Sequence, residues 1–175
     1  DEAGTSLTTG DDNVYIGYAA ADSATTGSGN IAIGENALGS LTAGSNNTAI
    51  GRDAMSLHNV DSNSNVALGF SALKVNVAGC RNTALGVNAL ADQNTSGTAT
   101  DTDNVAVGTS AGKSITSGIK NTIVGTLAGD ALTDADNNVA VGRAALSSDT
   151  KGSTSVAIGR NALISQNFTT STDSY

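Results

Sequence analysis

One short segment holds the side-chain types that nucleophilic catalysis uses. Ser56, His58 and Asp61 lie close together in it, and His58 is the single histidine of the chain. A catalytic triad requires a base held within reach of both its nucleophile and its orienting acid, and closeness in sequence does not fix that geometry. The G-x-S-x-G elbow is also absent. We therefore interpret His58 as an exposed loop residue and predict that the protein is not an enzyme.

The single cysteine, Cys80, lies in a predicted turn just before a short apolar run. Arg81 follows it, and a neighbouring cation can lower the pKa of a thiol. A thiol without a function is the simpler interpretation. One cysteine cannot form an intramolecular disulfide, so we expect a fold that does not rest on cross-links.

Paired carboxylates occur in three predicted turns, at 11–13, 101–104 and 134–138. Calcium prefers such oxygen ligands, but neither the EF-hand spacing nor the glycine-rich calcium nonapeptide is present. Asp and Asn are also ordinary turn formers. We expect no cofactor, and a structural calcium ion stays as an alternative.

Glycoside cleavage needs two carboxylates across a sugar-binding groove. The chain has only two glutamates, and aromatic residues that could stack on a sugar make up 3 % of it, so a glycosidase is not expected.

Composition excludes several further classes. The 175 residues carry a net charge of −8 with no cluster of Lys or Arg, which argues against nucleic-acid binding. No run of about 18 apolar residues is present, so we expect no transmembrane helix. The first ten residues lack the basic and apolar regions of a signal peptide. Phosphate-binding glycine motifs are absent too.

An internal repeat organises nearly the whole chain. A glycine follows each short apolar run at intervals of 17, 17, 18, 17, 22, 17, 17 and 17 residues. These strand glycines are Gly17, Gly34, Gly51, Gly69, Gly86, Gly108, Gly125, Gly142 and Gly159. Nine copies at a nearly constant period indicate a stacked repeat architecture.

Each column of the repeat has its own residue type. The residue four before the strand glycine is asparagine in eight copies and Ser155 in the ninth. The asparagines are Asn13, Asn30, Asn47, Asn65, Asn82, Asn104, Asn121 and Asn138. The next three positions read β-branched, usually Ala, then aliphatic, and Ala stands three after the glycine in every copy. Stacked asparagines can form a ladder of side-chain amide hydrogen bonds.

The repeat predicts an all-β, parallel β-solenoid. The three residues before each strand glycine read as a strand, and the x-x-A-L segment after it can form a second short extended piece. Turns rich in Gly and Asn join them, and a 17-residue unit has no room for a helix. Stacking about nine coils buries faces that one coil cannot bury alone. We expect one repeat domain over 10–165, an N-terminal edge at 1–9, and a tail or the start of a further segment at 166–175.

Both faces of the predicted strand are apolar, which indicates burial on both faces. Side chains alternate along a strand, so the β-branched residues point one way and Ala the other. We expect the larger residues to fill the lumen and the small Ala column to allow close approach of another chain. Together these expectations favour a homo-oligomer about a long axis, with three chains.

Exceptions to the repeat are the candidate contact positions. The long intervals place extra residues at 56–65 and 91–104, and recognition commonly lies on such bulges. The residues directly after each strand glycine also vary. The predicted surface contacts are Arg52, Asp53, His58, Phe70, Asp101, Asp103, Arg143 and Arg160.

The segments NTAIGRDAM, NVAVGRAAL and SVAIGRNAL resemble two groups of fibre proteins. One is the YadA-like head of trimeric autotransporter adhesins, and the other is the Asn-Thr-Ala-Ile-Gly-x-x-Ala-Leu repeat of bacteriophage tail fibres. The resemblance implies a left-handed β-roll, a homotrimer, and attachment to a host glycan or protein at a cell surface. Asparagine rather than serine in the ladder column and the 17-residue period favour the tail-fibre version.

The resemblance therefore implies a non-catalytic structural and adhesive segment, located in a virion tail fibre or at a cell surface. Two alternatives are a bacterial trimeric adhesin head and a self-assembling extracellular filament, because uncapped sheet edges can stack end to end. Ice binding would need a regular threonine row, and threonine fills the first strand position only at Thr48, Thr83 and Thr122.

Overall fold

Short strands make up all the regular secondary structure of the described residues. The structure, a computed structural model, describes residues 2–57, 62–95 and 99–173, and no helix occurs among them. The strands are β1 (Val14–Ile16), β2 (Ile31–Ile33), β3 (Thr48–Ile50), β4 (Val66–Leu68), β5 (Gly79–Cys80), β6 (Thr83–Leu85), β7 (Thr100–Asp101), β8 (Val105–Val107), β9 (Thr122–Val124), β10 (Val139–Val141), β11 (Gly152–Ser153), β12 (Val156–Ile158) and β13 (Thr172–Asp173).

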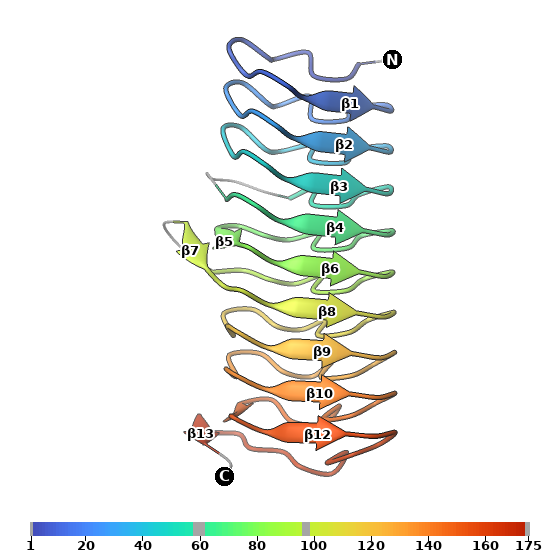
Figure 1. The fold of residues 1–175 in the computed structure, drawn as a ribbon, viewed down its shortest axis with the longest axis vertical. Coiled ribbons are helices and arrows are strands. Elements are labelled where there is room, and N and C mark those ends of the chain that lie inside the picture. Colours follow the sequence, from blue (N-terminus) through green and yellow to red (C-terminus); the bar gives the residue numbers. More distant parts are fainter. Residues whose placement is uncertain (1, 58–61, 96–98, 174–175) are drawn as a thin grey trace.

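Nine of these strands stack into one parallel sheet that runs the length of a rod (Figure 1). Their order is β1-β2-β3-β4-β6-β8-β9-β10-β12, and equivalent residues pair at every step, as in Ile31 with Thr48 and Ala32 with Ala49. The parallel β-solenoid expected from the repeat is confirmed. Nine strands delimit about eight full turns of about 17 residues.

The strand faces are opposite to the sequence-based expectation. The central residue of each strand points into the lumen: Ala32, Ala49 and Ala67 are fully buried, and the residues on either side of them point outward. Leucine and isoleucine side chains from the far wall of the coil, such as Leu38 and Leu41, also fill the lumen. Because the 17-residue coil is narrow, an alanine methyl fits opposite these leucines, and the larger Ile123 is buried at the same position where Gly129 stands in place of the leucine.

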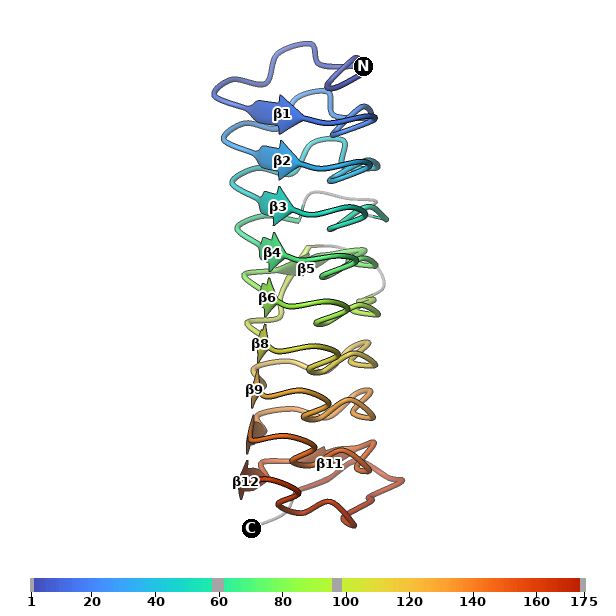
Figure 2. The same cartoon turned by 90° about the vertical axis from the view of Figure 1, so that its right-hand side faces the viewer.

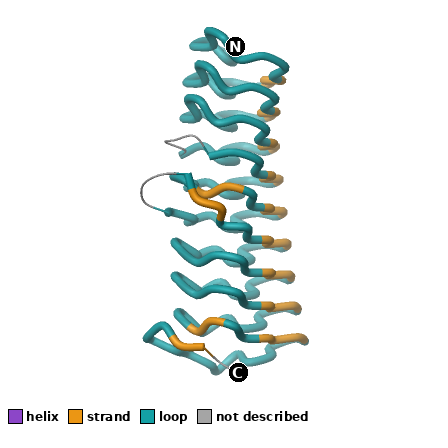
Figure 3. The backbone as a smooth tube through the Cα atoms, turned by 60° about the vertical axis from the view of Figure 1, so that its left-hand side comes forward, coloured by secondary structure: helices purple, strands orange, loops and turns teal. Residues whose placement is uncertain are grey.

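The x-x-A-L segment is a tight turn and not a second extended piece. The second and fourth residues after the strand glycine have left-handed backbone in every copy, for example Asp53 (φ 58°) and Met55 (φ 50°). The backbone therefore reverses within four residues while Ala54 and Met55 stay buried. Each repeat thus contributes one strand of the long sheet, and apart from the two-residue strands β5, β7, β11 and β13 the rest of the described coils is turn and loop (Figure 3).

The two long intervals leave the sheet register intact. Thr48 pairs with Val66 across the 18-residue interval, and Thr83 pairs with Val105 across the 22-residue interval. The added residues of the longer interval build β7, which pairs in parallel with β5 at the side of the stack (Figure 1). The described added residues of the longer interval therefore lie beside the long sheet without interrupting it, as the sequence predicts.

Candidate functional site

The asparagine column forms a hydrogen-bonded ladder inside the rod. The N–H of Asn47 donates to Oδ1 of Asn30 (2.9 Å), and the N–H of Asn65 donates to Oδ1 of Asn47 (3.0 Å). Each described Nδ2 except that of Asn82 donates to a backbone carbonyl of the following coil, as Asn30 does to Gly44 (2.9 Å). Direct amide-to-amide contacts are fewer, such as Asn121 to Asn104 (3.1 Å). The asparagine side chains of the ladder thus form hydrogen bonds with backbone groups next to the strands. Few of their donors and acceptors remain for binding a ligand.

Two further ladders were not predicted from the sequence. Threonines eight after the strand glycine donate their hydroxyls to the next coil, as Thr25 does to the Thr42 carbonyl (2.9 Å) and Thr133 to the Thr150 carbonyl (3.0 Å). In the second ladder, the side chain six residues before each strand glycine accepts a hydrogen bond from a backbone N–H of the preceding coil. The Ser45 hydroxyl, for example, accepts from the Ser28 N–H (3.1 Å). The signal was present in the sequence as small polar residues recurring every 17 positions.

Cys80 belongs to the second of these ladders. Its Sγ lies 3.4 Å from the backbone nitrogen of Asn63 as a hydrogen-bond acceptor, and the side chain is buried. Ser28, Ser45 and Ser153 accept hydrogen bonds at the equivalent positions of other coils. The thiol therefore has a structural role that a serine hydroxyl fills elsewhere in the same rod.

The outer face of the long sheet exposes many apolar side chains. We call it the aliphatic face: the first and third residues of the nine stacked strands. These residues are Val14, Ile16, Ile31, Ile33, Thr48, Ile50, Val66, Leu68, Thr83, Leu85, Val105, Val107, Thr122, Val124, Val139, Val141, Val156 and Ile158. All are half-buried or exposed, and Leu68 is 41 % exposed. The face follows one side of the rod (Figure 2).

A second line of exposed residues borders the aliphatic face at the carboxyl ends of the strands. We call it the ridge, and it consists of the residue after each strand glycine: Tyr18, Glu35, Arg52, Phe70, Val87, Thr109, Thr126, Arg143 and Arg160. The guanidinium of Arg52 lies over the ring of Phe70, 4.7 Å from its centroid. Asn36 donates to Asp53 (2.9 Å) beside them. Four predicted contact residues, Arg52, Phe70, Arg143 and Arg160, thus share one line.

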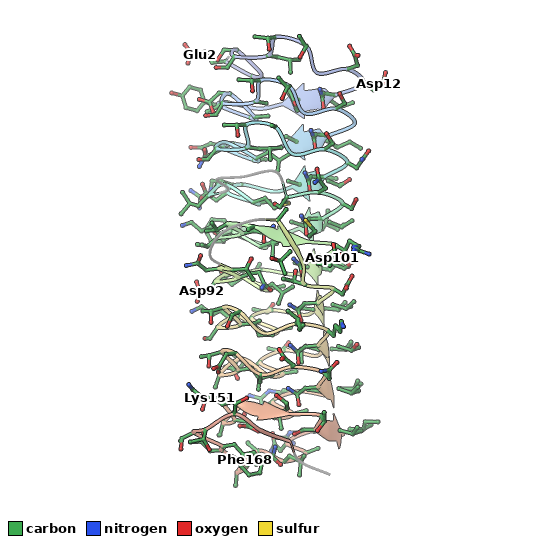
Figure 4. All side chains as sticks on the ribbon, turned by 90° about the vertical axis from the view of Figure 1, so that its left-hand side faces the viewer. Glu2, Asp12, Asp92, Asp101, Lys151 and Phe168 are labelled. Carbon is green, nitrogen blue, oxygen red and sulfur yellow. The ribbon has the colours of Figure 1, made fainter. Side chains whose placement is uncertain are left out.

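The remaining predicted contacts lie at the other border, at the amino ends of the strands. Arg81 forms ion pairs with Asp101 and, at 3.7 Å, with Asp103. Asp101 projects on the side of the rod that holds the sheet (Figure 4). The structure therefore gathers Arg81, Asp101 and Asp103 into one exposed cluster. His58 lies outside the described residues, as does Asp61.

The acidic turns do not converge within the described part of the chain. No group of three His, Cys, Asp or Glu side chains there could hold a metal ion. Asp134 accepts from the Thr133 hydroxyl (2.9 Å) and pairs with Lys151 (3.4 Å). Although desolvation opposes it, these hydrogen bonds and the lysine charge lower the pKa of Asp134. Burial raises the pKa of Asp130, one oxygen of which has no hydrogen-bond partner.

Polar side chains replace apolar ones at one lumen position, seven after the strand glycine. Leu41, Ile115 and Leu132 fill it in regular coils, whereas Asn76, Gln93 and Asp149 fill it near β5, β7 and β11. Asn76 accepts the N–H of Gly79 (3.1 Å), and Asp149 accepts that of Gly152 (3.0 Å). These contacts fix the backbone at the start of the small side strands.

Comparison with known proteins gives no assignment, because no family model, curated protein or solved structure matches the chain. None of the described residues forms a helix long and apolar enough to cross a membrane. The aliphatic face, the ridge and the charged cluster of Arg81, Asp101 and Asp103 are the surface features that bear on function.

Proposed function

We propose that the chain is a non-catalytic structural segment of a homotrimeric fibre, with the three aliphatic faces packed about a common axis. The aliphatic face carries this proposal. Its nine strands, about 4.8 Å apart, give a length of about 38 Å, and three residues of strand give a width of about 10 Å. A contiguous, largely apolar surface of about 400 Å² matches the largest patch of a typical monomer, and such patches are often functional.

Geometry favours a trimer over a dimer in which two aliphatic faces pack against each other. A standard interface buries about 800 Å² on each partner, which is about twice the area of the aliphatic face. Three chains about one axis also bring the ridge of each chain against the amino-end border of its neighbour. Cyclic symmetry makes the three rods parallel and level. At the amino-end border we compare the residue five before each strand glycine with the ridge residue of the same strand. At every level at most one of the two is charged, as with Arg52 opposite Asn46 and Arg143 opposite Asn137.

The biological role follows from the resemblance to fibre repeats. A trimeric rod of this kind suits a bacteriophage tail fibre that attaches to a glycan or protein on a host surface. A bacterial surface adhesin head is the second candidate, supported by the same repeat. In both roles the stack acts as a rigid spacer, and the variable residues at its borders make the contacts. The location is then a virion or a cell surface.

Sedimentation of a charged variant tests the assembly. Leu68→Asp places a carboxylate in the middle of the aliphatic face, where burial against two other chains would leave it unpaired. We expect the parent protein to sediment as a trimer and Leu68→Asp to sediment as a monomer at the same concentration. Circular dichroism of the monomeric variant should still show β structure.

Leu57→Asp is the matched control. Leu57 is 50 % exposed, against 41 % for Leu68, and lies outside the sheet, in the wall of the coil that pairs with Val75. This variant should stay trimeric. A parent protein that sediments as a monomer at high concentration would refute the proposed assembly.

A further inference from the structure

We infer that the small side sheet is a clasp that reaches across to a second copy of this chain. We call it the flap: β5, β7 and the residues beside them, Arg81, Thr102 and Asp103. The inference rests on the proposed trimer and adds a specific contact to it. In that contact the flap of one chain lies on Phe70 and Val87 of the neighbouring ridge.

The flap stands at the correct border and height. It projects from the amino ends of the strands, beside β4 and β6 (Figure 1). The ridge runs along the carboxyl ends, where Phe70 follows β4 and Val87 follows β6. Because a cyclic trimer keeps all chains level, the flap of one chain meets the neighbour at the level of these two residues.

The ridge has its one pair of adjacent apolar residues at this level. Phe70 is 39 % exposed and Val87 is 41 % exposed, and they lie on neighbouring strands. The ridge positions on either side of the pair are Arg52 and Thr109. Exposed apolar side chains that adjoin an apolar face are typical of a surface covered by a partner.

Charge is compatible with the same contact. The flap places two carboxylates, Asp101 and Asp103, around the single cation Arg81. The ridge carries three arginines and one glutamate, and Arg52 extends over Phe70 toward this level. A surface with excess negative charge thus faces one with excess positive charge, which favours the pairing.

The flap is held in a fixed position, as a clasp requires. Asn76 fixes the start of β5 through the Gly79 N–H, and β7 pairs with β5. The Thr102 hydroxyl lies within hydrogen-bond distance of two acceptors, Oδ1 of Asn82 (2.8 Å) and the Cys80 carbonyl (3.0 Å), and its single proton donates to one of them at a time. These bonds anchor the flap to the interior of the rod, so that little ordering is needed on assembly.

Disulfide trapping tests the clasp in the full chain with Cys80→Ser as background. Asp101→Cys with Val87→Cys should give covalently linked trimers on a non-reducing gel. Within one chain the two positions lie at opposite ends of β6, too far apart for a disulfide. The matched control, Asp101→Cys with Thr126→Cys, moves the ridge cysteine two strands along, about 10 Å away. It should give a cross-linked fraction roughly ten-fold lower, because a disulfide requires close Cα atoms.

Each outcome decides the inference. Strong cross-linking of the 101/87 pair and weak cross-linking of the 101/126 pair supports the clasp. Equal cross-linking, or none, in a protein that sediments as a trimer overturns the clasp and leaves the proposed trimer standing. A monomeric Cys80→Ser background that retains its β structure overturns both.

Discussion

The buried asparagines replace backbone partners that the narrow coil cannot supply. Most backbone groups beside the strands pair with the neighbouring coil, as the Ile31 N–H does with the Asn47 carbonyl (2.8 Å), but the N–H groups of Asn47 and Asn65 donate to asparagine side chains instead. Asn47 accepts from Asn65 and donates to the Ser62 carbonyl (3.0 Å), which connects it to the backbone of the next coil. Buried backbone groups are costly when unpaired, which explains why one residue type recurs at this column.

Removal of one ladder residue should therefore lower the free energy of unfolding. Asn47→Ala leaves the Asn65 N–H and the Ser62 carbonyl without their side-chain partner, and we expect a loss of about 3 kcal/mol in the free energy of unfolding. Its exposed neighbour provides the control: Asn46 has φ 59°, which glycine adopts freely, so Asn46→Gly should change stability by less than about 1 kcal/mol. Denaturant unfolding of both variants measures the difference. Equal losses would contradict the ladder as the cause.

Asp130 gives a pH-dependent prediction. Burial raises its pKa, so ionisation of the carboxyl group opposes folding. Its favourable contribution is present below the unfolded pKa and is lost as the pH rises through the raised folded pKa. Asp130→Asn should therefore raise the melting temperature at pH 7 and leave it nearly unchanged near pH 3. Thermal melts at both pH values test this, and a lower melting temperature at pH 7 would count against it.

At the scale of one coil, the strand glycines are required both by their backbone conformation and by the close approach of the next coil. Gly51 has φ 131°, a conformation that side chains disfavour, and a Cβ there would lie 2.6 Å from the carbonyl oxygen of Gly69. The chain thus turns the corner at the end of each strand while adjacent corners remain in close contact. The sequence shows the glycine column, but only the stack shows why no other residue fits.

Two alanine substitutions separate these causes. Gly159 has φ 120°, but a Cβ added there would meet no atom within 4 Å, whereas Gly51 is confined by the next coil. We expect Gly159→Ala to cost about 1–3 kcal/mol through backbone strain alone. Gly51→Ala adds a backbone clash and should cost more or prevent folding. Chemical denaturation compares them, and a larger loss for Gly159→Ala would contradict this account.

At the scale of the whole rod, stability is shared only between neighbouring coils. The strands of the long sheet contact only the strands next to them, which is the property of a one-dimensional repeat protein. The last described coil depends on Asp149, whose carboxylate accepts from Gly152, Gln166 and Phe168. A substitution that destabilises this end of the rod should therefore unfold only the coils next to it.

Asp149→Ala tests this independence. It removes the acceptor for four donors, the N–H groups of Lys151, Gly152 and Phe168 and the amide of Gln166, so amide hydrogen exchange should accelerate over 150–173 and stay unchanged over 14–107. Asp136→Ala is the control, because Asp136 accepts from Ile119 (2.8 Å) in the interior of the stack. There the faster exchange should centre on 119–138. Loss of protection along the entire rod would show that the coils unfold as one unit.

The sequence by itself determined the architecture of this protein. Glycines at a nearly constant spacing required a stack, because a 17-residue unit cannot bury its own apolar residues. The alternation of residue types identified the strands, and the 22-residue interval marked where β7 is added beside the stack. These conclusions depend on spacing along the chain, which the sequence shows directly.

Only the tertiary structure decided which face of the sheet is inside. A strand such as Thr48–Ile50 is apolar on both faces, so alternation alone cannot orient it. The choice depends on the volume that the far wall leaves in the lumen: Ala49 is buried where leucines fill that wall, and Ile123 is buried at the same position where Gly129 replaces the leucine. The stack likewise set Phe70 and Val87 side by side on the ridge and placed Asp101 at the opposite border, because lateral neighbours depend on how the coils close.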